Sequence, residues 1–159
     1  MLHLRSTSPA DTRAIAATIA TVVRPGDVVV LAGEMGAGKT AFAQGFGVAL
    51  GVTEPITSPT FNLVHSHPAG KLTLHHADLY RLGRQHEVAD LAFAELAESG
   101  GVVIVEWGDV VSTMLGDHLF VELVVDDDET HRTIAVQAVG REWAARWAGL
   151  QHALGVFAC

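Results

Sequence analysis

The segment that decides the fold spans residues 28–40 and reads VVVLAGEMGAGKT. Residues 28–31 are apolar without interruption, a pattern typical of a strand that is buried on both faces. Residues 33–40 match the spacing G-x-x-x-x-G-K-[ST], and residues 40–50 have the composition of a helix that Gly51 ends. A buried strand, a glycine-rich turn and a helix in direct succession indicate a loop that binds phosphate groups.

The residue types of this loop suit a polyphosphate ligand. Glycines let the backbone approach the ligand closely with its N–H groups pointing inward. The helix that follows aims its positive N-terminus at the same negative charge. We expect the Lys39 ammonium to reach the β- and γ-phosphates and the Thr40 hydroxyl to ligate Mg²⁺.

Two carboxylates follow predicted strands. Glu106 ends the apolar run 102–105, and Asp78 comes shortly after the alternating segment 72–76. An enzyme with a phosphate-binding loop usually carries an acidic residue near the metal or the attacking water, and a buried charge is costly unless it meets a cation. We therefore predict Glu106 as the first acidic site residue and Asp78 as the second. The alternative for each is a strand-end carboxylate that bonds to backbone or water.

The rest of the chain reads as further strands and helices. Pro9 opens the first helix, with Thr7 or Ser8 as its cap, and close packing would explain Gly45 and Gly47 inside the helix at 40–50. This first helix is predicted at 10–23, and further helices are predicted at 86–99 and 141–154. In addition to the strand at 28–31, strands are predicted at 61–65, 72–76, 102–105, 119–125 and 133–139. A turn is expected at 68–70, and the acidic run 126–129 is expected to be a solvated hairpin turn. These elements predict one α/β domain over residues 1–159, P-loop NTPase-like, with three layers and a mixed sheet.

Composition excludes several classes of protein. Of the 159 residues 49 % are hydrophobic, which argues against disorder, and no apolar run approaches the ~20 residues of a membrane span. Residues 1–9 lack an apolar signal core, so secretion is not expected. Cys159 is the single cysteine, which excludes an intramolecular disulfide and fits a cytoplasmic protein. The 10 basic against 18 acidic residues give a net charge of −8, which argues against binding nucleic acid unaided.

Histidine and tryptophan positions leave alternatives open. His65 and His67 would share a strand face, so a zinc site is conceivable, although surface or hydrogen-bonded histidines are the favoured interpretation. Trp107 follows Glu106, and a core role and a site role are about equally supported. Trp143 and Trp147 stand four apart in a predicted helix, a spacing that favours packing.

Three further motifs accompany the loop. They are Ser58-Pro59-Thr60-Phe61, His76-Ala77-Asp78-Leu79-Tyr80-Arg81 and Glu106-Trp107-Gly108-Asp109. In this combination the chain resembles the TsaE (YjeE) family, the bacterial ATPases of tRNA threonylcarbamoyladenosine synthesis, from about residue 9 to 140. The resemblance implies a compact α/β ATPase, slow by itself, that joins the proteins TsaB and TsaD. Those partners would hold the transferase chemistry and the tRNA.

The resemblance also implies roles for individual residues. ATP would be held by Gly33, Glu34, Met35, Gly36, Ala37, Gly38, Lys39, Thr40 and, by a looser match, Asp109. Mg²⁺ would be held by Thr40 and Glu106, catalysis would involve Asp78, Glu106, Trp107 and Thr60, and switch-like segments would include Ser58, Phe61, His76, Tyr80 and Arg81. Glu34-Met35 stands where the family usually has Asp-Leu, and His65 and His67 stand where it more often has an acid and an aromatic residue.

Other functions remain possible at this point. A small-molecule kinase needs arginines that close over the transferred phosphoryl group, and only Arg81 and Arg84 lie together near the motifs. A GTP-binding switch protein would need N-K-x-D, which the sequence lacks. A nucleotide-dependent assembly factor without catalysis overlaps with the ATPase hypothesis, and hydrolysis measured with and without partners separates the two.

Overall fold

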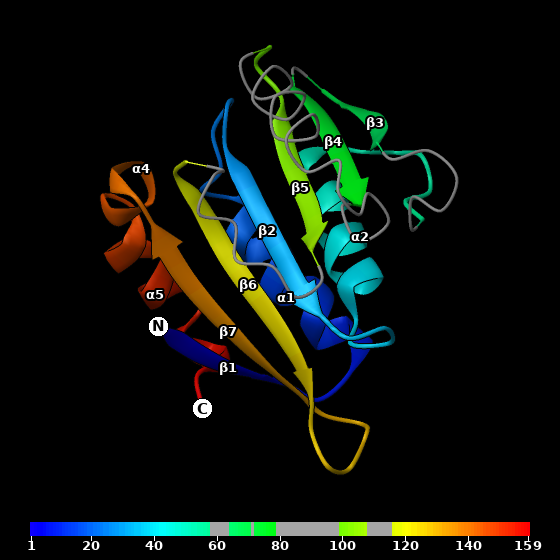
Figure 1. Cartoon of the computed structure of the whole chain (residues 1–159), viewed down its shortest axis with the longest axis vertical. Helices are drawn as coiled ribbons and strands as arrows, with labels where there is room; N and C mark the ends of the chain where they lie inside the picture. The colour runs from blue at the N-terminus through cyan, green and yellow to red at the C-terminus, as the bar shows by residue number, and fades with distance from the viewer. Residues whose placement is uncertain (58–63, 71, 79–98, 108–115) are drawn as a thin grey trace.

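The computed structural model describes residues 1–57, 64–70, 72–78, 99–107 and 116–159. These residues form a seven-stranded sheet with the order β1-β7-β6-β2-β5-β4-β3 (Figure 1). The strands are β1 (Leu2–Ser6), β2 (Val28–Gly33), β3 (Val64–Ala69), β4 (Leu72–Asp78), β5 (Val102–Trp107), β6 (His118–Val125) and β7 (Arg132–Val139). β2 runs parallel to β5 and β6, and β4 runs parallel to β5, whereas the pairs β1–β7, β6–β7 and β3–β4 are antiparallel. The predicted α/β class with a mixed sheet is therefore confirmed.

Two longer helices cover one face of the sheet, and both begin close to the positions that the sequence predicts. They are α1 (Pro9–Ala20) and α2 (Lys39–Leu50), which lie side by side behind β2 and β5 in Figure 1. The Ser8 hydroxyl accepts a hydrogen bond of 3.1 Å from the Asp11 N–H, which confirms the predicted cap of α1. α1 ends at Ala20, before the predicted end at residue 23. α2 ends at Gly51, whose φ of 109° is the left-handed conformation that glycine adopts readily.

Gly45 and Gly47 allow α2 to pack closely against its neighbours. A Cβ atom on Gly45 would lie 2.4 Å from the carbonyl oxygen of Arg13 in α1. A Cβ atom on Gly47 would lie 2.1 Å from Cδ1 of Ile56. A side chain on Gly45 would therefore force α1 and α2 apart, whereas one on Gly47 would displace the Ile56 side chain. Close packing explains both glycines, as predicted.

The central strands are buried on both faces. Val29 and Leu31 of β2 join the core with Phe46 of α2, and alternate residues Val28 and Val30 are buried as well. A strand alternates its side chains between faces, so an uninterrupted apolar run is what two buried faces require. This burial fits the three-layer arrangement that the sequence predicts.

β1 is an element that the sequence analysis missed. Residues 1–9 read as polar, yet Leu4 is fully buried and pairs with Ile134 at the edge of the sheet. His3 and Arg5 on either side of it are exposed. Leu2 and Leu4 alternate with His3 and Arg5, but two apolar residues are too short a pattern to distinguish an edge strand from a tail.

The prediction of one continuous C-terminal helix at 141–154 is wrong. The chain forms α4 (Arg141–Ala144) and α5 (Trp147–Ala153), followed by a 3₁₀ turn at Gly155–Phe157. Between the helices, the Arg146 guanidinium bonds to both oxygens of Asp27 at 2.6 and 2.9 Å and donates to the Val22 carbonyl at 2.9 Å. This buried ion pair holds the break in place, because a buried guanidinium needs its partners. Trp143 is buried and Trp147 packs against the same core, which confirms their packing role.

The hairpin β3–β4 is shifted relative to the sequence prediction. β3 extends to Ala69, so Pro68 and Ala69 lie in a strand rather than in the predicted turn at 68–70. Proline is tolerated there because β3 is the edge strand, where one side of the backbone needs no ladder partner. Residues 61–63 of the predicted strand and 86–98 of the predicted helix lie outside the described residues.

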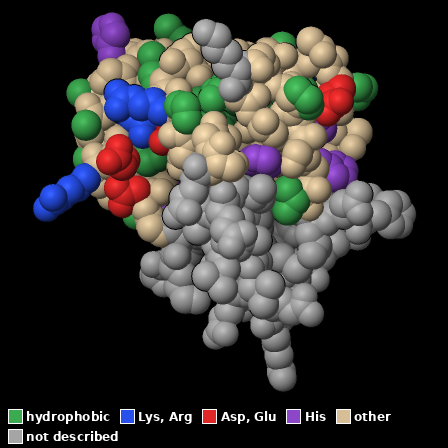
Figure 2. Space-filling view, turned by 90° about the horizontal axis from the view of Figure 1, so that it is seen from above, with side chains coloured by type: hydrophobic (Ala, Val, Ile, Leu, Met, Phe, Trp, Pro, Cys, Tyr) green, Lys and Arg blue, Asp and Glu red, His purple; other side chains and the backbone are tan. Residues whose placement is uncertain are grey.

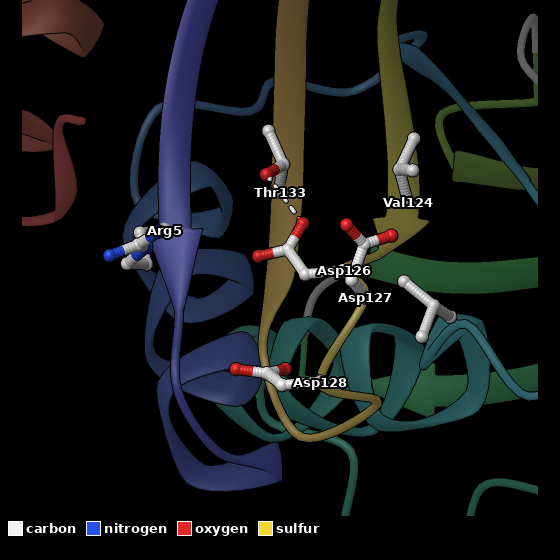
Figure 3. Close-up of a pocket in the computed structure, with 7 residues that line it drawn as sticks. Arg5, Val124, Asp126, Asp127, Asp128 and Thr133 are labelled. Carbon is white, nitrogen blue, oxygen red and sulfur yellow. Dashed lines mark hydrogen bonds between the residues drawn. The ribbon is translucent and has the colours of Figure 1, made fainter.

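The acidic run 126–129 lies in the β6–β7 connection, as predicted. In Figure 3 the carboxylates of Asp126, Asp127 and Asp128 surround a hollow that Arg5 of β1 borders on the other side. Asp126 accepts a hydrogen bond of 3.0 Å from the Thr133 hydroxyl. This bond joins the two arms of the β6–β7 hairpin beside the hollow. In the part of the chain that the structure describes, no helix is both long and apolar enough to cross a membrane.

Candidate nucleotide site

The glycine-rich loop and the two predicted carboxylates lie at the same edge of the sheet. β2 leads into the loop at Gly33, and the register aligns Leu31 of β2 with Glu106 of β5. Glu106 in turn pairs with Asp78 of β4. The three strands are parallel, so their carboxyl ends meet at one edge, the usual place of ligand sites in open α/β sheets. The structure therefore brings together the loop and both strand ends that the sequence singled out.

The loop presents positive charge at the start of α2. Gly38 precedes the helix with a φ of 107°, which a residue with a side chain rarely adopts. The Lys39 ammonium donates a hydrogen bond of 2.9 Å to the Gly33 carbonyl, so it lies back over the loop. Thr40 is half-buried in the first turn, and Met35 at the loop tip is exposed. An anionic group at this position would meet an ammonium, a helix N-terminus and backbone N–H groups.

Glu106 is a buried carboxylate whose observed partner is a histidine. It is 4 % exposed, and its Oε1 lies 3.0 Å from Nε2 of the fully buried His76 in β4. His76 Nδ1 has no hydrogen-bond partner in the described structure, so the proton of a neutral ring belongs on Nε2, where it is donated to Glu106. The sequence predicts a cation beside Glu106, and the family resemblance places His76 in a switch-like segment. The contact between them gives His76 a second role, that of fixing the carboxylate.

The donor set at this edge suits a hard cation. Mg²⁺ prefers oxygen ligands, and Thr40 offers a hydroxyl while Glu106 offers a carboxylate. Asp78 ends the neighbouring strand, although its side chain lies outside the described part of the structure. The residues that could hold Mg²⁺ are thus the two that the sequence predicted, with Asp78 at the adjacent register position.

Arg132 is a site residue that sequence reasoning missed. It begins β7, and its Nε and Nη2 atoms donate to the carbonyls of Ala37 and Gly36 at 3.1 and 3.3 Å. The contact joins residues 95 positions apart in the chain. No local sequence signal could have indicated it.

Several predicted site residues lie, wholly or in their side chains, outside the part of the chain that the structure describes. Trp107 is the last residue of β5 and pairs with Ala32, and its side chain is not among those described. The residues Ser58, Thr60, Phe61, Tyr80, Arg81 and Asp109 lie outside the described ranges. Their functional roles stay predictions.

The histidines of β3 are engaged with neighbouring side chains. His67 Nδ1 lies 2.5 Å from Oε1 of Glu54, and the rings of His65 and His67 meet edge to face with centroids 6.2 Å apart. In the described ranges, no three His, Cys, Asp or Glu side chains gather as a metal site. His67 is therefore a hydrogen-bonded histidine, which is the interpretation that the sequence favoured.

A mixed sheet with a phosphate-type loop after a central parallel strand defines a P-loop NTPase-like α/β protein. Residues 6–134 match the model of the family described as "Threonylcarbamoyl adenosine biosynthesis protein TsaE", and the chain belongs to this family. It therefore falls among the proteins of tRNA threonylcarbamoyladenosine biosynthesis.

Individual relatives agree with this assignment. The chain is 36 % identical to TsaE of Bacillus subtilis over 142 residues, which cover 89 % of each protein. It is 37 % identical to TsaE of Streptomyces coelicolor over 139 residues, which cover 83 % of this chain and 93 % of that protein. A crystal structure of Bacillus subtilis YdiB superposes with a TM-score of 0.75 at 30 % identity, covering 95 % of this chain and 94 % of that one. The resemblance drawn from the motifs is confirmed.

Proposed function

We propose that the protein is an ATP-binding, Mg²⁺-dependent ATPase, weak alone, that supports TsaB and TsaD in the threonylcarbamoylation of adenosine 37 of tRNA. The observation that carries this proposal is the shared edge of β2, β5 and β4, where the loop from Gly33 lies beside Glu106 and the end of β4. Family membership supports the assignment to this pathway, and the glycine-rich loop supports a nucleoside triphosphate as the ligand.

The residues at this edge have distinct roles in the proposed reaction. The loop residues 33–40 bind the triphosphate, and Lys39 exchanges its hydrogen bond with the Gly33 carbonyl for the β- and γ-phosphates. Thr40 and Glu106 would hold Mg²⁺, which would supply positive charge beside the phosphates. His76 keeps the Glu106 carboxylate in place through the 3.0 Å contact. Asp78, one strand away, orients the attacking water.

The proposal places tRNA on the partner proteins. A net charge of −8 disfavours a phosphate-rich ligand on this chain, so TsaB and TsaD would carry the tRNA and the transfer step. ATP hydrolysis here would then serve turnover of the assembly. The proposed function includes a cytoplasmic location, which the single cysteine supports.

Reconstitution tests this function directly. The protein is combined with TsaB, TsaD, tRNA, threonine, bicarbonate and ATP, and the modified nucleoside is measured over many turnovers. We expect modification to depend on this chain and on hydrolysable ATP. Multiple turnovers without this chain, or equal turnover with a non-hydrolysable analogue, would contradict the proposal. A parallel assay with small phosphoryl acceptors tests the kinase alternative, which predicts a phosphorylated product.

A further inference from the structure

The side chain of Arg132 bridges two separate parts of the chain. Its Nε and Nη2 atoms donate to the loop carbonyls of Ala37 and Gly36, as described above. Its Nη1 atom donates to the carbonyls of Glu129 and His131 at 2.8 and 3.1 Å. One guanidinium therefore ties the glycine-rich loop to the β6–β7 hairpin through four backbone acceptors.

These contacts set the direction of the loop's N–H groups. In a planar trans peptide the C=O and the N–H of the next residue point in opposite directions. Holding the Gly36 and Ala37 carbonyls toward Arg132 therefore turns the N–H groups of Ala37 and Gly38 away from it. The Ala37 N–H agrees with this direction, since it donates to the Glu34 carbonyl within the loop at 3.0 Å and not toward Arg132. Inward N–H groups are what a polyphosphate requires.

The hairpin gives Arg132 a rigid base. Asp128 Oδ1 accepts hydrogen bonds from the N–H groups of Thr130 and His131 at 3.0 and 2.9 Å. Glu129 has a φ of 62°, a left-handed conformation that a non-glycine residue adopts only when its surroundings impose it. The hairpin conformation is thus fixed on both sides of the Arg132 contacts.

We propose that Arg132 is a positioning residue that preorganises the loop for a nucleoside triphosphate, an inference that rests on the proposed ATP binding at this loop. Its planar fork reaches two neighbouring carbonyls at once, which a lysine ammonium does not reproduce. Without it, the loop peptides are free to rotate, and ATP binding must then order them.

The first test compares Arg132→Met with the matched control Arg5→Met. Arg5 is an exposed arginine on the adjacent strand β1, so its replacement removes the same charge near the same hairpin but leaves the loop contacts intact. We expect Arg132→Met to weaken Mg-ATP binding by roughly tenfold or more, the scale of a site that loses its preorganisation. Arg5→Met should bind Mg-ATP within about twofold of the wild type. Equal affinities of Arg132→Met and Arg5→Met would overturn the proposal.

The second test needs no nucleotide. Amide hydrogen exchange, measured by NMR on the free protein, should be faster at Gly36, Ala37 and Gly38 in Arg132→Met, with exchange in β6 and β2 unchanged. A merely structural role would instead speed exchange throughout the sheet. Unchanged loop exchange, or a uniform rise, would overturn the proposal.

Arg132→Lys separates positioning from charge and also replaces Arg132→Met if that variant fails to fold. It keeps the positive charge but not the fork, so we expect ATP binding still to be weakened at least about fivefold. Wild-type affinity in Arg132→Lys would mean that charge alone matters and would overturn the proposal. Failure of the wild type itself to bind ATP would refute the proposed function instead, and the exchange experiment would still decide the role of Arg132.

Discussion

Lys39 is the residue whose chemistry is tied most directly to a bound triphosphate. Its ammonium now bonds to the Gly33 carbonyl at 2.9 Å, within the loop that would surround the phosphates. We expect Lys39→Ala to abolish tight ATP binding, because the loop then loses its cation for the β- and γ-phosphates. Titration with a fluorescent ATP analogue measures this. Lys71→Ala, which removes the chain's other lysine, is the charge-matched control, and wild-type affinity in Lys39→Ala would refute the phosphate-loop assignment.

Glu106 is the second residue whose replacement is informative. Glu106→Gln keeps the shape and still accepts the hydrogen bond from His76 Nε2, so the fold should persist. Loss of the negative charge should lower hydrolysis strongly and make nucleotide binding much less dependent on Mg²⁺. Hydrolysis rates and binding isotherms over a Mg²⁺ series provide the measurement. An unchanged rate and an unchanged Mg²⁺ dependence would move the metal role to Asp78.

Replacing Trp107 tests whether this residue has a role in the core or in the site. The sequence supports both roles about equally, because Trp107 follows an apolar run and stands next to the predicted site residue Glu106. A core role predicts that Trp107→Ala lowers the free energy of unfolding by roughly 3–5 kcal/mol. The family resemblance favours the other outcome, a folded protein that has lost ATPase or partner-dependent activity. Thermal unfolding and an activity assay on the same variant decide, and a large drop in melting temperature would assign Trp107 to the core.

The site residues fall into two groups: those of one contiguous motif, and those that contact residues far away in the chain. Lys39 and Thr40 belong to one contiguous motif, so the sequence alone indicates them. The bond between His76 and Glu106 spans 30 residues, and the bond from Arg132 to Ala37 spans 95. Spacing along the chain carries no record of such contacts, because they arise only when the strands pair. The sequence could therefore predict the motif residues but not the side chains that hold them.

At the scale of elements, the β3–β4 hairpin carries a pH-sensitive histidine. Burial lowers the pKa of His75 below its usual value of 6.5, and its Nδ1 lies 2.8 Å from the Ser66 hydroxyl. Below that pH the unfolded chain binds the proton more readily than the folded one, so His75 makes stability fall as the pH falls. We expect His75→Gln to lose less stability than the wild type between pH 7.5 and pH 5.5, two values chosen to bracket about 6.5.

Denaturant unfolding at the two pH values measures this difference. The two proteins differ only at residue 75, so the comparison isolates His75. An identical loss of stability in the wild type and in His75→Gln would contradict the assignment.

The elements that the sequence predicts well are those with strong local patterns. The apolar runs of β2 and β5 and the capped helix α1 are examples, since period and cap signals lie within the element itself. The break between α4 and α5 is different, because it accompanies an ion pair between Arg146 and Asp27, which are 119 residues apart. An unbroken helical pattern across 141–154 gives no hint of that partner.

In the whole molecule, the strands on the two sides of β2 carry different groups of site residues. β5 and β4 on one side carry Glu106, His76 and Asp78, whereas β6 and β7 on the other side lead to Arg132. The glycine-rich loop emerges between them and contacts the second side through its carbonyls. In the proposed function, one half of the sheet would supply the reaction chemistry and the other half would hold the phosphate-binding backbone in shape.

The charge of the whole molecule leads to a prediction about tRNA. The net charge is −8, and Figure 3 shows the carboxylates of Asp126, Asp127 and Asp128 in the β6–β7 hairpin. Arg132 ties this hairpin to the glycine-rich loop through its hydrogen bonds to the Glu129 and Gly36 carbonyls. Figure 2 shows another face, on which the described Lys and Arg side chains lie toward one side, with Asp and Glu side chains beside them. A phosphate backbone is bound mainly through clustered cations, so the isolated protein should bind tRNA weakly or not at all at physiological salt.

Filter binding of labelled tRNA to the isolated protein measures this, with the reconstituted complex with TsaB and TsaD as the positive control. Lowering the salt concentration strengthens any phosphate contact steeply, so a titration over salt also counts the cations involved. We expect the complex to retain tRNA on the filter and the isolated chain to retain little or none. Binding of tRNA to the isolated chain should not rise steeply when the salt concentration is lowered. Micromolar affinity of the isolated chain would contradict the prediction, because it would require a cationic surface strong enough to overcome the net charge of −8.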